Sequence, residues 1–207
     1  MIECRTYTFQ PGRLPAYLAL IEREGVLDRL LQNMRGYWLG ESGVVNTAWH
    51  VWQYADRAGR AAARAKLAAD PIVSGFMREA LPLLRQQHSI FLNGELETAP
   101  SGPAGGVFDR VELRRAPGDL ASARETLAEL GKAIGQRAQI VAALRGSPLE
   151  GGHNITHAIF VLRFPSFAER AEQAPGLESA LEDAAAGGWH CVGDQQLMLP
   201  AKFSPWQ

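Results

Sequence analysis

The chain has 207 residues, of which 46% are hydrophobic and 21% are charged, and its formal net charge at pH 7 is −1. This balance is typical of a globular protein and excludes the strongly basic surface that binds nucleic acid or anionic membranes. Two cysteines exclude a multi-cysteine zinc cluster, and no apolar run is long enough to span a membrane. We therefore expect a cytoplasmic protein with no membrane span and no nucleic-acid partner.

The first half of the sequence alternates between strand-like and helical patterns. Residues 1–9 are rich in β-branched and aromatic residues, and Pro11 and Gly12 end this strand-like run. Asp56 is the expected N-cap of an Ala/Arg-rich helix, and a further helix is expected from Asp70 and Pro71. The expected strands are 1–9, 36–43, 46–54 and 88–92, and the expected helices are 14–25, 56–69 and one that starts at 70.

The second half repeats this order after a turn-rich segment. Residues 96–106 contain APSGPAGG and are the expected linker between a domain at 1–95 and a domain at 107–207. The expected strands of the second domain are 107–115, 138–144, 155–164 and 189–199, and its expected helices are 119–136 and 166–185. Each half therefore has the order β-α-β-β-α-β, which is typical of a ferredoxin-like unit.

Short motifs also recur in the same order in both halves. RTYTFQPG at 5–12 is matched by VELRRAPG at 111–118, and AWHVWQY at 48–54 is matched by AIFVLRF at 158–164. Repeats of this size are a fold-level signal. We interpret them as a tandem repeat of two α+β units, whose sheets could cover one another and close a barrel-like core.

The first hundred residues resemble the NIPSNAP family. The resemblance rests on the motifs ECRTYTFQPG at 3–12, WLG at 38–40, HVWQY at 50–54 and DP at 70–71, and on Arg57, Arg60, Arg64 and the run 86–92. The family is similar to the dimeric α+β barrel superfamily, in which two ferredoxin-like units pack sheet against sheet. That superfamily includes cofactor-independent monooxygenases, haem-degrading enzymes and lactone isomerases. The NIPSNAP branch itself has no settled activity, and its name links it to vesicular transport.

Strand alternation brings polar and aromatic side chains of the first half to one face. Glu3, Arg5 and Tyr7 share a face of the first strand, and His50, Trp52 and Tyr54 share a face of the third strand. If these strands are neighbours, this face can form a small-molecule pocket between the two sheets. We predict His50 as a general base and Arg5 or Tyr7 as the group that stabilises an oxyanion. The candidate ligand contacts are Glu3, Trp52, Tyr54 and Trp38.

A structural interpretation of the same residues remains open. Glu3 and Arg5 could form a buried ion pair, and His50 could be a hydrogen-bonded core histidine. The second half helps to weigh the two interpretations, because most of the corresponding positions are apolar there. Glu3, Arg5 and Tyr7 correspond to Asp109, Val111 and Leu113, and His50 and Trp52 correspond to Phe160 and Leu162. A network needed only for folding should recur in both halves, so the comparison favours one site, in the first half.

Two functions follow from this site. The first is the binding or transformation of a small molecule in a cavity between the sheets, like a cofactor-independent monooxygenase or isomerase. The alternative is a non-catalytic binding or adaptor protein related to the vesicular-transport members of the family. We expect no cofactor and no metal, because the lone His88 on a strand is a weak candidate for a haem ligand. A small-molecule ligand and a homodimer are the expected partners.

Overall fold

The computed structural model describes residues 1–96, 105–116, 119–146, 157–193 and 195–206. The chain divides into two compact units: unit 1 consists of Met1–Ile90 and Pro200–Gln207, and unit 2 consists of Phe91–Leu199. Most of the expected linker at 96–106 lies outside the described residues, and the domain boundaries at 95 and 107 stay a prediction.

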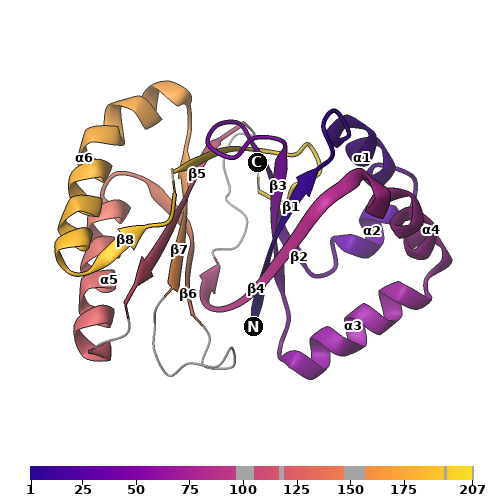
Figure 1. Ribbon diagram of the computed structural model, residues 1–207, viewed down its shortest axis with the longest axis horizontal. Helices are drawn as coiled ribbons and strands as arrows, with labels where there is room; N and C mark the ends of the chain where they lie inside the picture. The colour runs from indigo at the N-terminus through magenta and orange to yellow at the C-terminus, as the bar shows by residue number, and fades with distance from the viewer. Residues whose placement is uncertain (97–104, 117–118, 147–156, 194, 207) are drawn as a thin grey trace. The chain divides into compact units, whose positions relative to one another are not determined.

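Unit 1 is an antiparallel sheet with helices on one face. Its strands are β1 (Ile2–Phe9), β2 (Met34–Gly40), β3 (Thr47–Gln53) and the first part of β4 (Leu84–Leu96), in the order β4-β1-β3-β2. Its helices are α1 (Leu14–Ile21), α2 (Val26–Leu30), α3 (Arg57–Ala69), α4 (Pro71–Ala80) and the short 3-10 helix η1 (Leu81–Leu83). Figure 1 shows α1 to α4 on the same side of these strands. The strand order and the one-sided helices are those of a ferredoxin-like unit.

Side-chain caps explain where α3 and α4 begin. The Asp56 carboxylate accepts the backbone N–H of Gly59 at 2.7 Å, and the Asp70 carboxylate accepts the N–H of Ile72 at 2.9 Å. Pro71 occupies the first position of α4, where a residue without an N–H loses no helical hydrogen bond. Both predicted helix starts are confirmed.

Two expected segments of unit 1 differ in the structure. The second strand begins at Met34 and ends at Gly40, earlier than the predicted 36–43. The helix predicted over 14–25 ends at Ile21, and a second helix, α2, begins after Gly25. Gly25 has φ of 77°, a left-handed conformation that interrupts an α-helix. The tail 200–207 was expected in the second domain but groups with unit 1. There the Ala201 N–H donates to the Tyr37 carbonyl at 3.0 Å, and the Ser204 hydroxyl accepts the Tyr37 N–H at 3.0 Å.

Unit 2 has the same arrangement of elements. Its strands are the end of β4, β5 (Val107–Arg115), β6 (Gln139–Gly146), β7 (His157–Phe164), β8 (Trp189–Cys191) and β9 (Gln196–Pro200), and its helices are α5 (Leu120–Gly135) and α6 (Phe167–Ala186). β7 lies between β6 and β5, while both β8 and β9 pair with β5. The single strand predicted over 189–199 is therefore two strands. The first residues of the predicted strand 155–164 lie outside the described residues.

Helices cover one face of the sheet in each unit and bury an apolar core there. In Figure 1, α5 and α6 lie on the same side of β5, β6 and β7. The buried cluster of unit 1 includes Phe9, Tyr17 and Phe76, and that of unit 2 includes Ile134, Phe160 and Leu177. The predicted fold class, α+β with two ferredoxin-like βαββαβ units, is confirmed.

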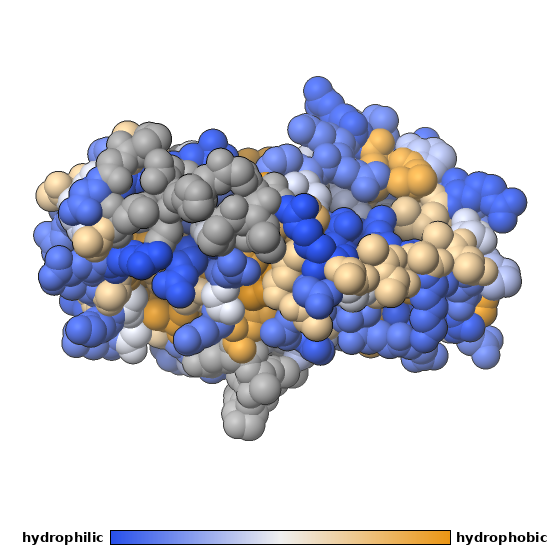
Figure 2. All heavy atoms as spheres, turned by 90° about the horizontal axis from the view of Figure 1, so that it is seen from below, coloured by the Kyte–Doolittle hydropathy of each residue, from blue (hydrophilic) through white to orange (hydrophobic). Residues whose placement is uncertain are grey.

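The visible surface is mainly hydrophilic. Figure 2 shows one face, on which apolar residues form only small groups among hydrophilic ones. The large apolar side chains exposed among the described residues are Val44, Val45, Ile72, Leu81, Phe167 and Val192. In the described part of the chain, no helix combines the length and the apolar character needed to cross a membrane.

Candidate functional site

The strand register of unit 1 brings the predicted site residues together. β1 and β3 pair antiparallel, with Glu3 opposite Trp52 and Arg5 opposite His50. β2 adds Tyr37 on the other side of His50. Directly paired residues in neighbouring strands project to the same face of a sheet. The predicted grouping of these side chains on one face is therefore what the structure shows.

This face lies under the helices of unit 1 and lines a cavity of about 410 Å³. The sheet contributes Arg5, Tyr7, Tyr37, His50 and Trp52 to the cavity wall. The helices contribute mostly apolar side chains, among them Tyr17, Leu67, Val73, Phe76 and Met77. The sequence predicted that this face lies between the two sheets. This prediction is wrong, because the helices of unit 1 cover the face. Both faces of β1 and β3 are largely buried, so polarity along the strands does not reveal which face the helices cover.

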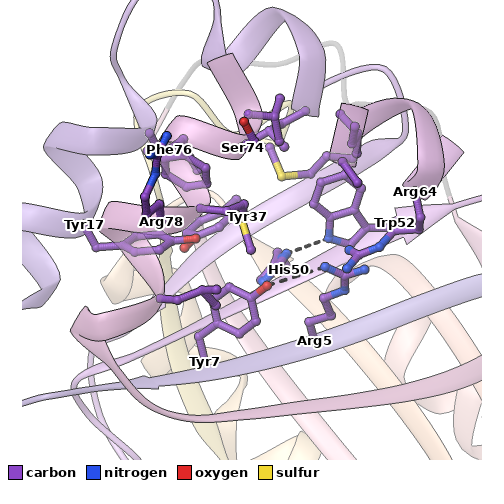
Figure 3. Close-up of a pocket in the computed structure, with 18 residues that line it drawn as sticks. Arg5, Tyr7, Tyr17, Tyr37, His50, Trp52, Arg64, Ser74, Phe76 and Arg78 are labelled. Carbon is purple, nitrogen blue, oxygen red and sulfur yellow. Dashed lines mark hydrogen bonds between the residues drawn. The ribbon is translucent and has the colours of Figure 1, made fainter. Parts of the chain in front are cut away.

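Exposed lining residues mark where the cavity reaches the surface. Arg64 and Ala68 on α3 and Ser74 and Arg78 on α4 line the cavity and are themselves exposed. The other end is closed by the buried aromatic side chains of the sheet. Figure 3 shows Tyr7, His50, Arg5 and Trp52 along the sheet, with Phe76 and Ser74 above them and Arg64 beside Trp52. A small molecule would therefore enter between α3 and α4.

Glu3 is the centre of a buried ion network beside the cavity. It receives hydrogen bonds from Arg5 Nε at 2.9 Å, from Arg60 Nη2 at 2.8 Å and from the Ser89 hydroxyl at 2.8 Å. Burial alone would raise the pKa of this carboxyl, but the bonds to Arg60, Arg5 and Ser89 together outweigh it and lower the pKa to about 2. Glu3 does not line the cavity. Its hydrogen bond with Arg5 Nε holds the Arg5 side chain in place.

Arg5 keeps part of its guanidinium free. Its Nε bonds to Glu3, and its Nη1 lies 3.5 Å from the Tyr7 hydroxyl, which is a long contact. Its guanidinium carbon lies 5.2 Å from the Trp52 ring centroid, in cation–π range. Nη2 is buried and has no hydrogen-bond partner among the described residues. A buried donor without a partner is costly, so this atom is available to a bound molecule.

His50 is held by Trp52. The indole Nε1–H of Trp52 donates to His50 Nδ1 at 2.6 Å, and an indole can only donate. Nδ1 must therefore carry the lone pair, so the neutral imidazole has its proton on Nε2. Burial, followed by the charge of Arg5, lowers the pKa of His50 well below 6.5, so the ring is neutral at pH 7. This geometry argues against the predicted general base, because the atom left for a ligand, Nε2, donates a proton rather than accepting one.

His50 Nε2 is also without a partner in the described part of the structure. The ring packs between two tyrosines, stacked on Tyr37 at 5.0 Å and edge-on to Tyr7 at 4.6 Å between centroids. These contacts fix the plane of the imidazole. The site therefore offers two buried donors, Arg5 Nη2 and His50 Nε2, from directly paired residues of neighbouring strands.

Besides Glu3, two further predicted ligand contacts, Trp38 and Tyr54, lie away from the cavity. Trp38 projects from the opposite face of the sheet, where its ring packs at 5.3 Å from Trp49. Its strand neighbour Tyr37 lines the cavity in its place, since adjacent residues of a strand alternate in direction. Tyr54 follows the end of β3 and is buried, which raises the pKa of its hydroxyl, but it does not line the cavity.

Sequence reasoning missed the residues that line the cavity from the helices and from β2. Tyr17 and Tyr37 are the most polar of the buried ones, and burial strongly raises the pKa of both hydroxyls. Both therefore stay protonated at neutral pH. Arg64 was noted as part of the family motif but not as a site residue. Its position four residues after Arg60 on one face of α3 was the available signal.

The described residues form no metal site. They contain no group of three His, Cys, Asp or Glu side chains that could hold a metal ion. His88, the weak haem-ligand candidate, is exposed on β4. The lining residues of the cavity offer donors and aromatic surfaces instead of metal ligands.

Unit 2 repeats the strand register but not the donors. Asp109 is opposite Leu162 and Val111 is opposite Phe160, as Glu3 is opposite Trp52 and Arg5 opposite His50 in unit 1. The ion pair also recurs: Arg170 Nε contacts both Asp109 carboxylate oxygens at 2.8 and 2.9 Å. Like Arg60, Arg170 lies four residues after the N-cap of its helix. The carboxylate–arginine pair is thus common to both units, whereas the Arg5–His50 pair occurs in unit 1 only.

Comparisons with known proteins find a family match in the first half of the chain. The NIPSNAP family model matches residues 2–94. An uncharacterized NIPSNAP domain protein from Burkholderia xenovorans is 36% identical, with a TM-score of 0.40, and the match covers 49% of this chain and 97% of that chain. A NIPSNAP family protein from Agrobacterium tumefaciens is 30% identical, with a TM-score of 0.40, and the match covers 42% of this chain and 79% of that chain. Among curated proteins, none matches significantly.

Other solved structures match nearly the whole chain at low identity. A putative monooxygenase from Fusobacterium nucleatum is 7% identical, with a TM-score of 0.65, and the match covers 97% of this chain and 92% of that chain. A putative monooxygenase from Lactobacillus acidophilus gives a TM-score of 0.58 at the same identity and coverage. At this identity the likeness shows the fold alone, and it confirms the predicted type, the dimeric α+β barrel. Through its residues 2–94, the chain belongs to the NIPSNAP family.

Proposed function

We propose that unit 1 binds a small organic molecule in the helix-covered cavity and acts on it by stabilising negative charge on an oxygen atom. The observation that carries this proposal is the pair of buried donors, Arg5 Nη2 and His50 Nε2, at a cavity of about 410 Å³. Cavities of roughly 300–1,000 Å³ with mostly apolar walls and a few polar groups are typical of small-molecule sites.

The chemistry that these groups support is oxyanion stabilisation. Donors that are fixed before the reaction lower the free energy of an anion that develops beside them. Reactions of the isomerase and cofactor-independent monooxygenase kind pass through enolates or related anions, so the two donors suit this class. The putative monooxygenases that match the whole chain support the same class at the level of fold. No cofactor is part of the proposal.

The adaptor alternative expects an interior filled by side chains. The cavity in unit 1 favours small-molecule binding over that alternative. A homodimer and a cytoplasmic location stay predictions from the sequence and its resemblance.

A cavity-filling variant tests the proposal. Ala68 lines the cavity from an exposed position of α3, so Ala68→Trp should fill its entrance with little cost to the fold. Adding 4-nitrophenol or its neutral analogue 4-nitrotoluene to the wild-type protein should shift amide NMR signals of the lining residues, for example Tyr17, Leu67 and Phe76. For Ala68→Trp, the concentration of each probe that gives half of the maximal shift should rise at least tenfold.

Ala62→Trp is the matched control. Ala62 is exposed on the same helix and does not line the cavity, so this variant should bind both probes like the wild type. If neither probe moves the signals of the lining residues in the wild-type protein, or if both tryptophan variants bind equally well, the proposed function is wrong.

A further inference from the structure

The polar end of the cavity carries positive charge without negative charge. Arg5 and Arg64 line this end, whereas Arg78 lines the cavity beside Phe76 and Tyr17 (Figure 3), and among the described lining residues none has a carboxylate. The nearest carboxylate, Glu3, lies behind Arg5 and is shared by Arg5 and Arg60. Within the described residues, Arg64 has no ion-pair partner, and the partial burial of its guanidinium and the charge of Arg5 lower its pKa. One carboxylate, Glu3, thus lies beside three guanidinium groups, those of Arg5, Arg60 and Arg64, which leaves an excess of positive charge beside the cavity.

The two free donors lie in this positive region. Arg5 is 7% exposed and His50 is 2% exposed, so both are more than nine-tenths buried. Arg5 can only donate hydrogen bonds, and the Trp52 bond makes His50 a donor at Nε2 as well. Figure 3 shows the two side chains next to each other below the aromatic wall. Two buried donors on directly paired residues, beside a positive charge, suit an acceptor that carries negative charge.

The rest of the cavity is apolar and aromatic. Tyr17 and Phe76 pack edge to face at 5.8 Å, and Leu67, Val73 and Met77 complete this wall. An inorganic anion would leave this wall without a contact. The wall requires an apolar body of the ligand, from which the acceptor oxygen projects toward Arg5 and His50.

From these observations we propose that the cavity selects organic anions: a carboxylate, enolate or phenolate oxygen on an apolar body, with the oxygen held by Arg5 and His50. This inference rests on the proposed function and specifies its substrate class. The ligand would bind already ionised, or would lose its proton more easily in the cavity than in water. The first case fits carboxylates, and the second fits enols and phenols.

Matched probes test this selectivity with the full-length protein. 4-Nitrotoluene is neutral, 4-nitrophenol reports its ionisation by absorbance, and 4-nitrobenzoate carries a carboxylate on the same ring. Wild-type protein should bind 4-nitrophenolate or 4-nitrobenzoate about tenfold to a hundredfold more tightly than 4-nitrotoluene, as expected for hydrogen bonds to a buried charge. Bound 4-nitrophenol should ionise at lower pH than the free compound. Preference for 4-nitrobenzoate would assign carboxylates, and preference for 4-nitrophenolate would assign enols and phenols.

Substitution of Arg5 identifies the group responsible. Arg5→Met should remove the preference for the anions while 4-nitrotoluene still binds, which also shows that the cavity is intact. Glu3 retains Arg60 and Ser89 in this variant, and Arg5→Lys keeps the charge and should keep part of the preference. Arg13→Met removes an equal charge from an exposed residue outside the cavity and should change nothing.

The outcomes separate the two proposals. If 4-nitrotoluene binds in the cavity as tightly as the anions, the anion inference is overturned and the proposed binding function stands. If no probe binds, the proposed function itself falls. If the anions are preferred equally by wild-type protein and Arg5→Met, the assignment to Arg5 is overturned.

Discussion

At the scale of single residues, the hydrogen bond between Trp52 and His50 fixes which atom of the imidazole is left for a ligand. It fixes the tautomer of the imidazole, because the indole donates its only N–H to Nδ1. A histidine held in this way, with a lowered pKa, acts as a neutral donor and not as a base. Under the proposed function, His50 would therefore stabilise an oxyanion, the role that the sequence suggested for Arg5 or Tyr7.

A double-mutant cycle measures this bond. His50→Phe removes the acceptor and leaves the buried Trp52 N–H without a partner, which should cost about 1–3 kcal/mol in free energy of unfolding beyond the packing change. In a Trp52→Phe background this extra cost should vanish. Chemical denaturation of the four proteins should thus give a coupling energy of about 1–3 kcal/mol. Additive effects, within about 0.5 kcal/mol, would show that the bond contributes nothing.

The ion network of Glu3 predicts how the stability of the fold changes at acidic pH. The pKa of Glu3 falls from its usual 4.5 to about 2 in the folded protein, although burial opposes this shift. A carboxyl whose pKa is lower in the folded than in the unfolded protein stabilises the fold at pH values above the unfolded pKa. This stabilisation is lost as the pH falls from about 4.5 toward 2. A shift of this size corresponds to about 3 kcal/mol.

Glu3→Gln should therefore remove most of this loss from a plot of unfolding free energy against pH, and it should be less stable than wild type at pH 7. Glu79→Gln is the control, because Glu79 pairs with Arg23 on the surface, where ion pairs contribute little. A wild-type stability that stays level from pH 4.5 to 2 would contradict the role given to Glu3.

At the scale of secondary-structure elements, the sequence predicts which side chains share a face of the sheet better than where the helices pack on it. Strand alternation correctly groups Arg5, His50 and Trp52, because the register of β1 and β3 is regular. Alternation also places Trp38 and Tyr37 on opposite faces of β2. Deciding which of the two faces the cavity requires the register between β2 and β3. That register contains an irregularity between Met34 and Gly36, which period-two reasoning from sequence alone does not anticipate.

The helix contribution to the cavity could not be predicted from periodicity. Helical spacing shows which residues of α1 and α4 are apolar, but not where along the sheet each helix packs. Tyr17 and Phe76 meet because α1 and α4 cross the same part of the sheet. The side of the sheet that the helices cover was unpredictable for a related reason: both faces of β3 are buried, so hydrophobicity does not distinguish them.

Two glycines test the packing of these elements. A Cβ on Gly36 would lie 2.0 Å from the Trp38 ring, whereas a Cβ on Gly75 in α4 meets nothing within 4 Å. Gly36→Ala should therefore lower the unfolding free energy by about 1–3 kcal/mol through overpacking. Gly75→Ala should raise it by about 0.5–1 kcal/mol, since alanine favours the helix. Equal effects of the two substitutions on thermal unfolding would contradict the packing described for β2.

At the scale of the whole molecule, the two units share a framework and differ in their polar groups. Both have the same strand register and a carboxylate–arginine pair at the same place, Glu3 with Arg60 and Asp109 with Arg170. Unit 2 also has a cavity, of about 280 Å³, but Phe160 lines it at the position that corresponds to His50. The recurrence of the ion pair identifies it as part of the framework. The absence of the two donors from the equivalent positions makes unit 1 the candidate site.

A crystal structure of the protein with 4-nitrophenol would show whether unit 1 holds the ligand and which atoms contact its oxygen. We predict one molecule in each chain, in the cavity of unit 1, with its oxygen within hydrogen-bond distance of Arg5 Nη2 and His50 Nε2 and its ring against Tyr17 and Phe76. A cavity of unit 1 that stays empty at saturating 4-nitrophenol, or a ligand bound in unit 2 instead, would contradict the account.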